Sequence, residues 1–197
     1  IRLGWFYGDG TYPSKEELHT EVDRLLAKFP ALRLALAHFY FLSSDMERAA
    51  RFLDAHPTVC FDLTPNGEMY RDFSQDPAAW RQFFNKYQTQ ILFGTDTENL
   101  TSYDPGQSIR IIAEFLGGEG TSVDWTGGIT QPIGLGEDAL ANICRENLIR
   151  RQGATPRPIN VRAALDEVLK LRNVPAPLDT LAVQNLQVMA SYYERLP

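Results

Sequence analysis

The sequence predicts an α/β protein built on a parallel sheet. Three short apolar runs have the length and composition of buried strands, and a segment with helical periodicity precedes each of them. This alternation of helix and strand is typical of parallel sheets. Each run also ends in one ionisable residue: His38, Asp62 and Asp96. Because barrels of parallel strands place their active sites at the carboxyl ends of those strands, these three side chains are the main functional candidates.

Capping and breaking residues mark the amino-terminal elements. Residues 1–13 are rich in glycine and aromatic side chains and predict a loop. Ser14 and Glu17 form a capping-box pattern that starts a helix, and Pro30 ends it. The elements expected next are a strand over 32–38, a helix over 45–56 and a strand over 58–63.

The later elements follow from the same signals. Asp76 is a good N-cap and Pro77 a good first residue for a helix to about Tyr87, after a loop over 64–75. The remaining expectations are a strand over 90–95, a helix over 104–116, a glycine-rich loop over 117–136, and helices over 137–151, over 161–172 and up to about Arg195. Three strand–helix units are too few to close a barrel, so they predict either an open sheet or the last part of a barrel.

Composition narrows the class of protein. The 197 residues are 44% hydrophobic and 22% charged, as in ordinary soluble domains. A net charge of −6 without a basic run argues against a nucleic-acid partner. The sequence has neither an 18-residue apolar stretch nor a signal-peptide pattern, so we expect no membrane partner. Cys60 and Cys144 are expected to be reduced, which favours a cytoplasmic location; a homo-oligomer remains open.

Strand periodicity brings the three candidates together. Side chains alternate along a strand, so the faces expected to point inward carry three sets of residues: Leu34, Leu36 and His38; Thr58, Cys60 and Asp62; Leu92, Gly94 and Asp96. With that register, His38, Asp62 and Asp96 converge at one rim of the sheet.

Each candidate has a functional and a structural interpretation. Asp96 is expected to bind a metal or to accept a proton, or else to cap the following loop. His38 is expected to bind a metal, water or substrate, or else to be a satisfied core histidine. Asp62 either contacts substrate or only bonds the backbone of a turn.

Other residues carry weaker signals. The loop over 4–12 offers Tyr7, Asp9 and Tyr12 as an aromatic wall for an organic substrate, with loop packing as the alternative. His19 lies four residues before Asp23 and predicts a solvated pair on a helix face. The glycines fit no phosphate-binding fingerprint, and the sequence contains no GxSxG, CxxC or HExxH pattern.

Four segments resemble the amidohydrolase-related family of metal-dependent TIM-barrel enzymes, which includes the aminocarboxymuconate-semialdehyde decarboxylase type. The segments are Ala31–His38, Phe61–Thr64, Ile91–Asp96 and Ile143–Asn147, and the match covers roughly residues 14–152. The resemblance implies that residues 1–153 form the carboxyl-terminal part of a TIM (β/α)8 barrel, with strands six to eight and about three βα units. Residues 154–197 would then be a helical carboxyl-terminal extension.

The resemblance also implies roles. In such enzymes the strand-eight aspartate, here Asp96, binds the metal and takes part in proton transfer, and the strand-six histidine, here His38, contacts the metal-bound water or the substrate. The other ligands are a His-x-His after strand one and a histidine after strand five, which this sequence lacks. Since the chain also begins without methionine, we expect a fragment that is inactive alone.

The expected function of the full-length parent is that of a metal-dependent hydrolase or non-oxidative decarboxylase. Its substrate would be a small organic molecule, aromatic or carboxylated, and its cofactor a divalent metal, with Zn²⁺ favoured. One alternative is a catalytically degenerate small-molecule-binding or scaffolding protein on the same fold. Another is a metal-free α/β enzyme with an open sheet that uses Asp96 and His38 directly as acid and base.

Overall fold

The computed structural model describes residues 10–65, 68–96, 105–124, 127–174 and 180–196. Contacts divide the chain into two compact units, Ile1–Gly153 and Ala154–Pro197, and each unit is described by itself. Within the described residues, none of the helices has the length and apolar character needed to cross a membrane.

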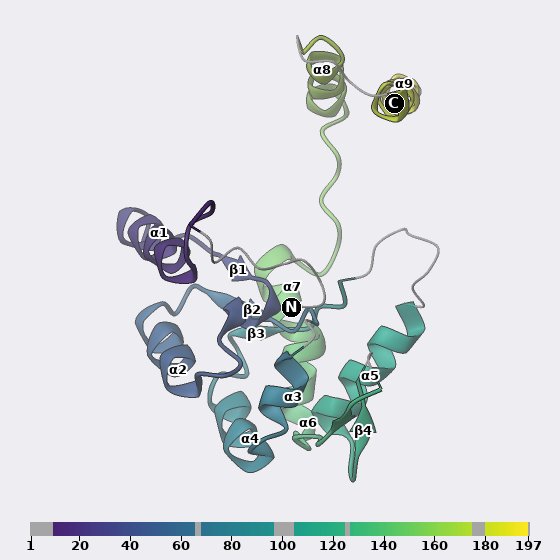
Figure 1. The fold of residues 1–197 in the computed structure, drawn as a ribbon. Coiled ribbons are helices and arrows are strands. Elements are labelled where there is room, and N and C mark those ends of the chain that lie inside the picture. Colours follow the sequence, from purple (N-terminus) through teal and green to yellow (C-terminus); the bar gives the residue numbers. More distant parts are fainter. Residues whose placement is uncertain (1–9, 66–67, 97–104, 125–126, 175–179, 197) are drawn as a thin grey trace. The chain divides into compact units, whose positions relative to one another are not determined.

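The first unit is a mixed α/β structure (Figure 1). Its helices are α1 (Lys15–Lys28), α2 (Met46–Ala55), α3 (Met69–Phe73), α4 (Pro77–Lys86), α5 (Pro105–Gly117), α6 (Glu137–Ala141) and α7 (Asn147–Gln152). Its strands are β1 (Ala35–Leu36), β2 (Cys60–Asp62), β3 (Ile91–Leu92), β4 (Ser122–Val123) and β5 (Ile129–Thr130). Two further segments differ from an α-helix. The segment η1 (His38–Phe41) has the tighter hydrogen bonding of a 3-10 helix, and η2 (Asn142–Glu146) has the wider turn of a π-helix. The second unit holds α8 (Val161–Arg172) and α9 (Thr180–Tyr193).

The main sheet is parallel, with the strand order β1-β2-β3. This confirms the predicted alternation of helices with parallel strands. Figure 1 shows α1, α2 and α4 following one another along the same side of these strands. Strands in sequence order occur both in a barrel and in half of an open sheet, and the described strands form no closed barrel.

The helix starts predicted from local sequence are confirmed. The Ser14 hydroxyl accepts a hydrogen bond from the Glu17 N–H at 3.2 Å, and the Glu17 carboxylate accepts one from the Ser14 N–H at 2.7 Å. Asp45 caps α2 through the Arg48 N–H, and Asp76 caps α4 through the Ala79 N–H. These bonds span three residues, so the local sequence is enough to specify them.

Other predicted boundaries are wrong. The strands are two or three residues long, so His38 and Asp96 lie beyond their ends. The predicted loop over 64–75 contains α3, and the glycine-rich segment over 117–136 contains the antiparallel hairpin β4-β5. In both segments, packing against the core stabilises elements with weak local signals.

The main hydrophobic cluster lies on one face of the sheet. In the strand register Leu36 lies opposite Phe61, and Phe61 lies opposite Ile91, so these three residues share a face. The predicted grouping of Leu36 with the Cys60 and Asp62 face is therefore wrong. Aromatic rings fill the core side, where Phe39 contacts the rings of Phe61, Phe73, Trp80, Phe83 and Phe84.

The outer edge of β3 is covered by a helix rather than by another strand. The Phe93 N–H donates to the Ile143 carbonyl of η2 at 3.0 Å. The Asn147 amide donates to the Ile91 carbonyl at 2.6 Å and to the Gln88 carbonyl at 2.7 Å. Asn147 is 1% exposed, so these bonds replace those that a neighbouring strand would make with β3.

Candidate functional site

His38 begins a turn of unusual backbone conformation directly after β1. His38, Phe39, Tyr40 and Phe41 all have φ between 54° and 55°. The left-handed conformation costs an L-residue roughly 1–2 kcal/mol. Burial of Phe39, Tyr40 and Leu42 offsets this cost. Backbone strain of this kind is common at functional sites, so the turn supports His38 as a functional candidate.

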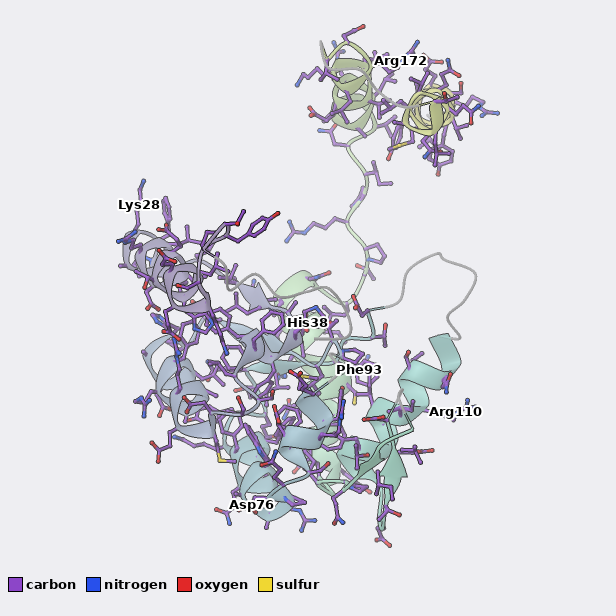
Figure 2. All side chains as sticks on the ribbon, viewed as in Figure 1. Lys28, His38, Asp76, Phe93, Arg110 and Arg172 are labelled. Carbon is purple, nitrogen blue, oxygen red and sulfur yellow. The ribbon has the colours of Figure 1, made fainter. Side chains whose placement is uncertain are left out.

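Two hydrogen bonds hold His38 against the end of β2. Its backbone N–H donates to Asp62 Oδ1 at 3.1 Å, and its ring Nδ1 lies 3.1 Å from the carbonyl oxygen of Thr64. The same Asp62 oxygen accepts the Thr64 N–H at 3.0 Å. Figure 2 shows His38 near the centre of the first unit, at the strand ends. The structure thus brings His38 and Asp62 together at the strand ends, through the His38 backbone rather than through its ring.

The contact with Thr64 determines what the ring can do. A carbonyl oxygen only accepts hydrogen bonds, so Nδ1 must carry the proton. In the neutral ring, Nε2 is then left with a lone pair. Histidines that bind metals or act as bases are commonly oriented in this way, with the other ring nitrogen donating to a carbonyl or carboxylate. His38 is half-buried, which suits a group that is oriented yet accessible.

Gly94 makes this arrangement sterically feasible. A Cβ at Gly94 would lie 2.5 Å from Thr64 Oγ1 and 3.1 Å from the Thr64 nitrogen, so a side chain there would displace Thr64. The expected register puts Gly94 on one strand face with Leu92 and Asp96; in the structure its close neighbours are Thr64 and Asp62. Thr64 was not predicted as a site residue, because a backbone carbonyl leaves no signal in the sequence.

Asp96 lies farther from the sheet than expected. It is exposed, four residues beyond β3, and has a φ of 52°. The alternation that was expected to align it with Leu92 and Gly94 is therefore broken, because the chain has left the strand. None of the contacts of the described residues joins Asp96 to His38.

The described residues do not complete a metal centre. No three His, Cys, Asp or Glu side chains in the described part of the chain come close enough to hold one ion. A catalytic zinc site takes three protein ligands. His38 Nε2 and the Asp96 carboxylate are suitable donor types, but on their own they do not provide a full ligand set.

Of the remaining predicted site residues, the structure describes only Tyr12. Tyr7 and Asp9 lie outside the described residues. Tyr12 is described and 57% exposed, just before α1. Their role in substrate binding stays a prediction.

An open groove runs between α1 and the turn that begins with His38. Its volume is about 830 Å³, within the range of small-molecule sites. Leu18 and Val22 of α1 and Leu36 and Phe41 on the opposite side make it largely apolar. His38 does not line the groove, but its ring lies 5.3 Å from the ring of Phe41, which does.

The structure corrects the interpretation of His19. It is 6% exposed, and its ring stacks on Tyr40 at 4.2 Å. Arg48 Nη2 lies 2.8 Å from His19 Nδ1, and because arginine only donates, Nδ1 accepts this bond. Burial first, and then the charges of Arg48 and Lys15, lower the pKa of His19. Burial also raises the pKa of Tyr40 to about 12, so this cluster is uncharged apart from Arg48 and its partner Glu16.

Comparisons of the chain with protein-family models, with curated proteins and with solved structures find no match.

Proposed function

We propose that the chain is the carboxyl-terminal part of a metal-dependent hydrolase or non-oxidative decarboxylase that acts on a small organic substrate. One observation carries the proposal: His38 and Asp62 meet at the carboxyl ends of adjacent parallel strands, with the His38 ring oriented by the Thr64 carbonyl. This is the edge where parallel α/β enzymes hold their chemistry. The strained turn at His38 supports a functional rather than a packing role.

The three side chains have separate roles in this proposal. His38 accepts a hydrogen bond or proton at Nε2 from water or substrate. Asp62 is a positioning residue, because its Oδ1 holds the backbone of His38 and Thr64. Asp96 serves as metal ligand and as proton acceptor, exposed at the same end of the sheet.

The cofactor is expected to be a divalent metal, with Zn²⁺ favoured. Such an ion lowers the pKa of a bound water and polarises the substrate. Asp96 is the ligand that the described residues contribute, and the other ligands, a His-x-His and a further histidine that this sequence lacks, are expected from the rest of the full-length parent.

The groove suggests the class of substrate. Its apolar lining fits an aromatic or aliphatic body, and Lys15 among its lining residues offers a positive charge to a carboxylate. Lys15 Nζ is already oriented toward the turn by its bond to the Phe41 carbonyl at 2.5 Å. An aromatic or carboxylated small molecule is therefore the proposed substrate.

Metal analysis of the full-length protein tests the proposal. The wild type is expected to bind about one metal ion per protein chain. Asp96→Asn is expected to lose most of the bound metal, because a neutral amide is a poor zinc ligand. Asp54→Asn is the matched control, since Asp54 is an exposed aspartate paired with Lys86 on the helical side, and it should keep the metal. Near-zero metal in both the wild type and Asp96→Asn would refute the metal-dependent function. The metal-free and non-catalytic alternatives would then remain.

A further inference from the structure

The first unit has another hollow, distinct from the groove beside α1. Its volume is about 450 Å³, within the range of small-molecule sites. Its lining comes from three places: Arg81 of α4, residues 117–120 at and after the end of α5, and residues 132–135 before α6. The residues His38, Asp62 and Asp96 of the candidate site do not line it. We call this hollow the α4–α5 pocket.

The guanidinium of Arg81 is held in place at this pocket. Its Nε–H donates a hydrogen bond to the Ile133 carbonyl. Gly134 lets the guanidinium lie against the backbone, because a Cβ there would be 2.7 Å from Arg81 Nη2. Among the described residues, none accepts a hydrogen bond from Nη1 or Nη2 and no carboxylate forms an ion pair with Arg81. The remaining guanidinium donors are thus available to a ligand.

Glu119 brings the opposite charge to the same pocket. It is exposed and, among the ion pairs of the described residues, takes part in none, although Arg81 also lines the pocket. Glu119 follows the end of α5, and the carboxyl end of a helix carries a partial negative charge that favours a cation. The pocket thus presents one cationic and one anionic side chain that are not paired with each other.

These two charges limit the class of ligand. A purely anionic molecule would meet the Glu119 carboxylate as well as Arg81, and a purely cationic molecule would meet Arg81 as well as Glu119, so each would bring like charges together. A molecule with both charges avoids this repulsion, because a carboxylate suits the guanidinium fork and an ammonium group suits a carboxylate. Pro132 and Leu135 add apolar surface that suits a short aliphatic chain.

We propose that the α4–α5 pocket binds a small aliphatic amino acid, with the ligand carboxylate on Arg81 and the ligand ammonium group on Glu119. An exposed ion pair between Arg81 and Glu119 would contribute little to stability, so the fold loses little by leaving both side chains to a ligand. This assignment goes beyond the proposed catalytic function and does not depend on it.

Calorimetric titration of the full chain with zwitterions of graded length tests this assignment. The probes are glycine, β-alanine, γ-aminobutyrate and 5-aminopentanoate, in which the two charges lie progressively farther apart. The wild type is expected to bind at least one of them with a Kd in the millimolar range or lower. Butyrate and butylamine carry only one charge each and should bind at least about tenfold more weakly, because each lacks one charge-assisted contact.

Two variants assign the two contacts to their residues. Arg81→Gln should weaken binding of the best zwitterion by at least about tenfold, while butylamine binds at least as well as to the wild type. Glu119→Gln should weaken zwitterion binding to a similar extent, while butyrate binds at least as well as to the wild type. Arg110→Gln is the matched control, because Arg110 is an exposed arginine of α5 outside the pocket, and this variant should bind like the wild type.

Two results would overturn the proposal. One is a wild type that binds each zwitterion no more tightly than butyrate and butylamine. The other is an equal loss of binding in Arg81→Gln and Arg110→Gln, which would assign the binding to general surface charge. Circular dichroism checks that the variants keep the wild-type helical content. If Arg81→Gln does not fold, Glu119→Gln decides the outcome, because the Glu119 side chain forms no ion pair with the described residues whose loss could unfold the chain.

Discussion

At the scale of single residues, Asp62 explains how the candidate site is held. One of its oxygens accepts both the His38 and the Thr64 N–H, so a single carboxylate joins the ends of β1 and β2. The sequence left open whether Asp62 contacts substrate or only bonds a turn. The observed bonds are those of the turn interpretation, extended across two strands.

Removing that oxygen should destabilise the first unit. Asp62→Ala leaves two partly buried N–H groups without their acceptor, and we expect the free energy of unfolding to fall by about 2 kcal/mol. Asp62→Asn keeps an acceptor oxygen and should cost less than about 1 kcal/mol. Urea denaturation of the two variants beside the wild type measures the difference. Equal losses for alanine and asparagine would show that these two bonds do not stabilise the fold.

At the scale of elements, the π-helical turn of η2 explains how the edge of β3 is covered. Phe93 donates to the Ile143 carbonyl, which an unbroken α-helix would use for its own ladder. Asn147, at the start of α7, then donates to the Ile91 and Gln88 carbonyls. The backbone hydrogen-bonding groups at the outer edge of β3 are thus paired with groups of a helix instead of a neighbouring strand.

We expect Asn147→Leu to cost about 3 kcal/mol of unfolding free energy, because one buried and one partly buried carbonyl lose their donor while the side-chain volume is kept. Asn142→Leu is the control on the preceding turn. Asn142 is half-buried and donates to the Gln88 side chain, which can rotate to water, so that variant should cost less than about 1 kcal/mol. Thermal or urea unfolding measures both losses. If Asn142→Leu were the more damaging variant, the role assigned to Asn147 would be wrong.

At the scale of the whole molecule, the pH dependence of folding should reflect His19, whose cluster joins α1, the turn after β1 and α2. Burial lowers the pKa of His19 in the folded state below its ordinary value of 6.5. The unfolded chain therefore binds more protons at acidic pH. Stability is complete above about pH 6.5 and is lost as the pH falls from there toward the lowered pKa.

Unfolding free energies at about pH 8 and about pH 5 test this effect. The wild type should be less stable at the lower pH, and His19→Gln should remove most of the difference. His56→Gln, at the carboxyl end of α2, is the control and should keep it. If His19→Gln kept the wild-type pH dependence, the loss of stability at low pH would come from other titratable groups.

Features that depend on neighbours in the chain could be predicted from the sequence alone. The caps at Ser14, Asp45 and Asp76 are bonds to residues three positions away, so the helix starts could be predicted. The alternation of helices with apolar runs likewise predicted a parallel sheet, because strands buried on both faces require such runs.

Which side chains meet depends instead on the folded core. Four features depend on partners more than twenty residues away in the chain. They are the strand face of Leu36, the burial of His19, the contact of Asn147 with the edge of β3, and the contact of the Thr64 carbonyl with His38. Local periodicity contains no information about such partners, because the register between strands and the packing of helices on them are set by the whole core. For the same reason His38 and Asp62 could be named from their strand ends, whereas their contact through the backbone could not.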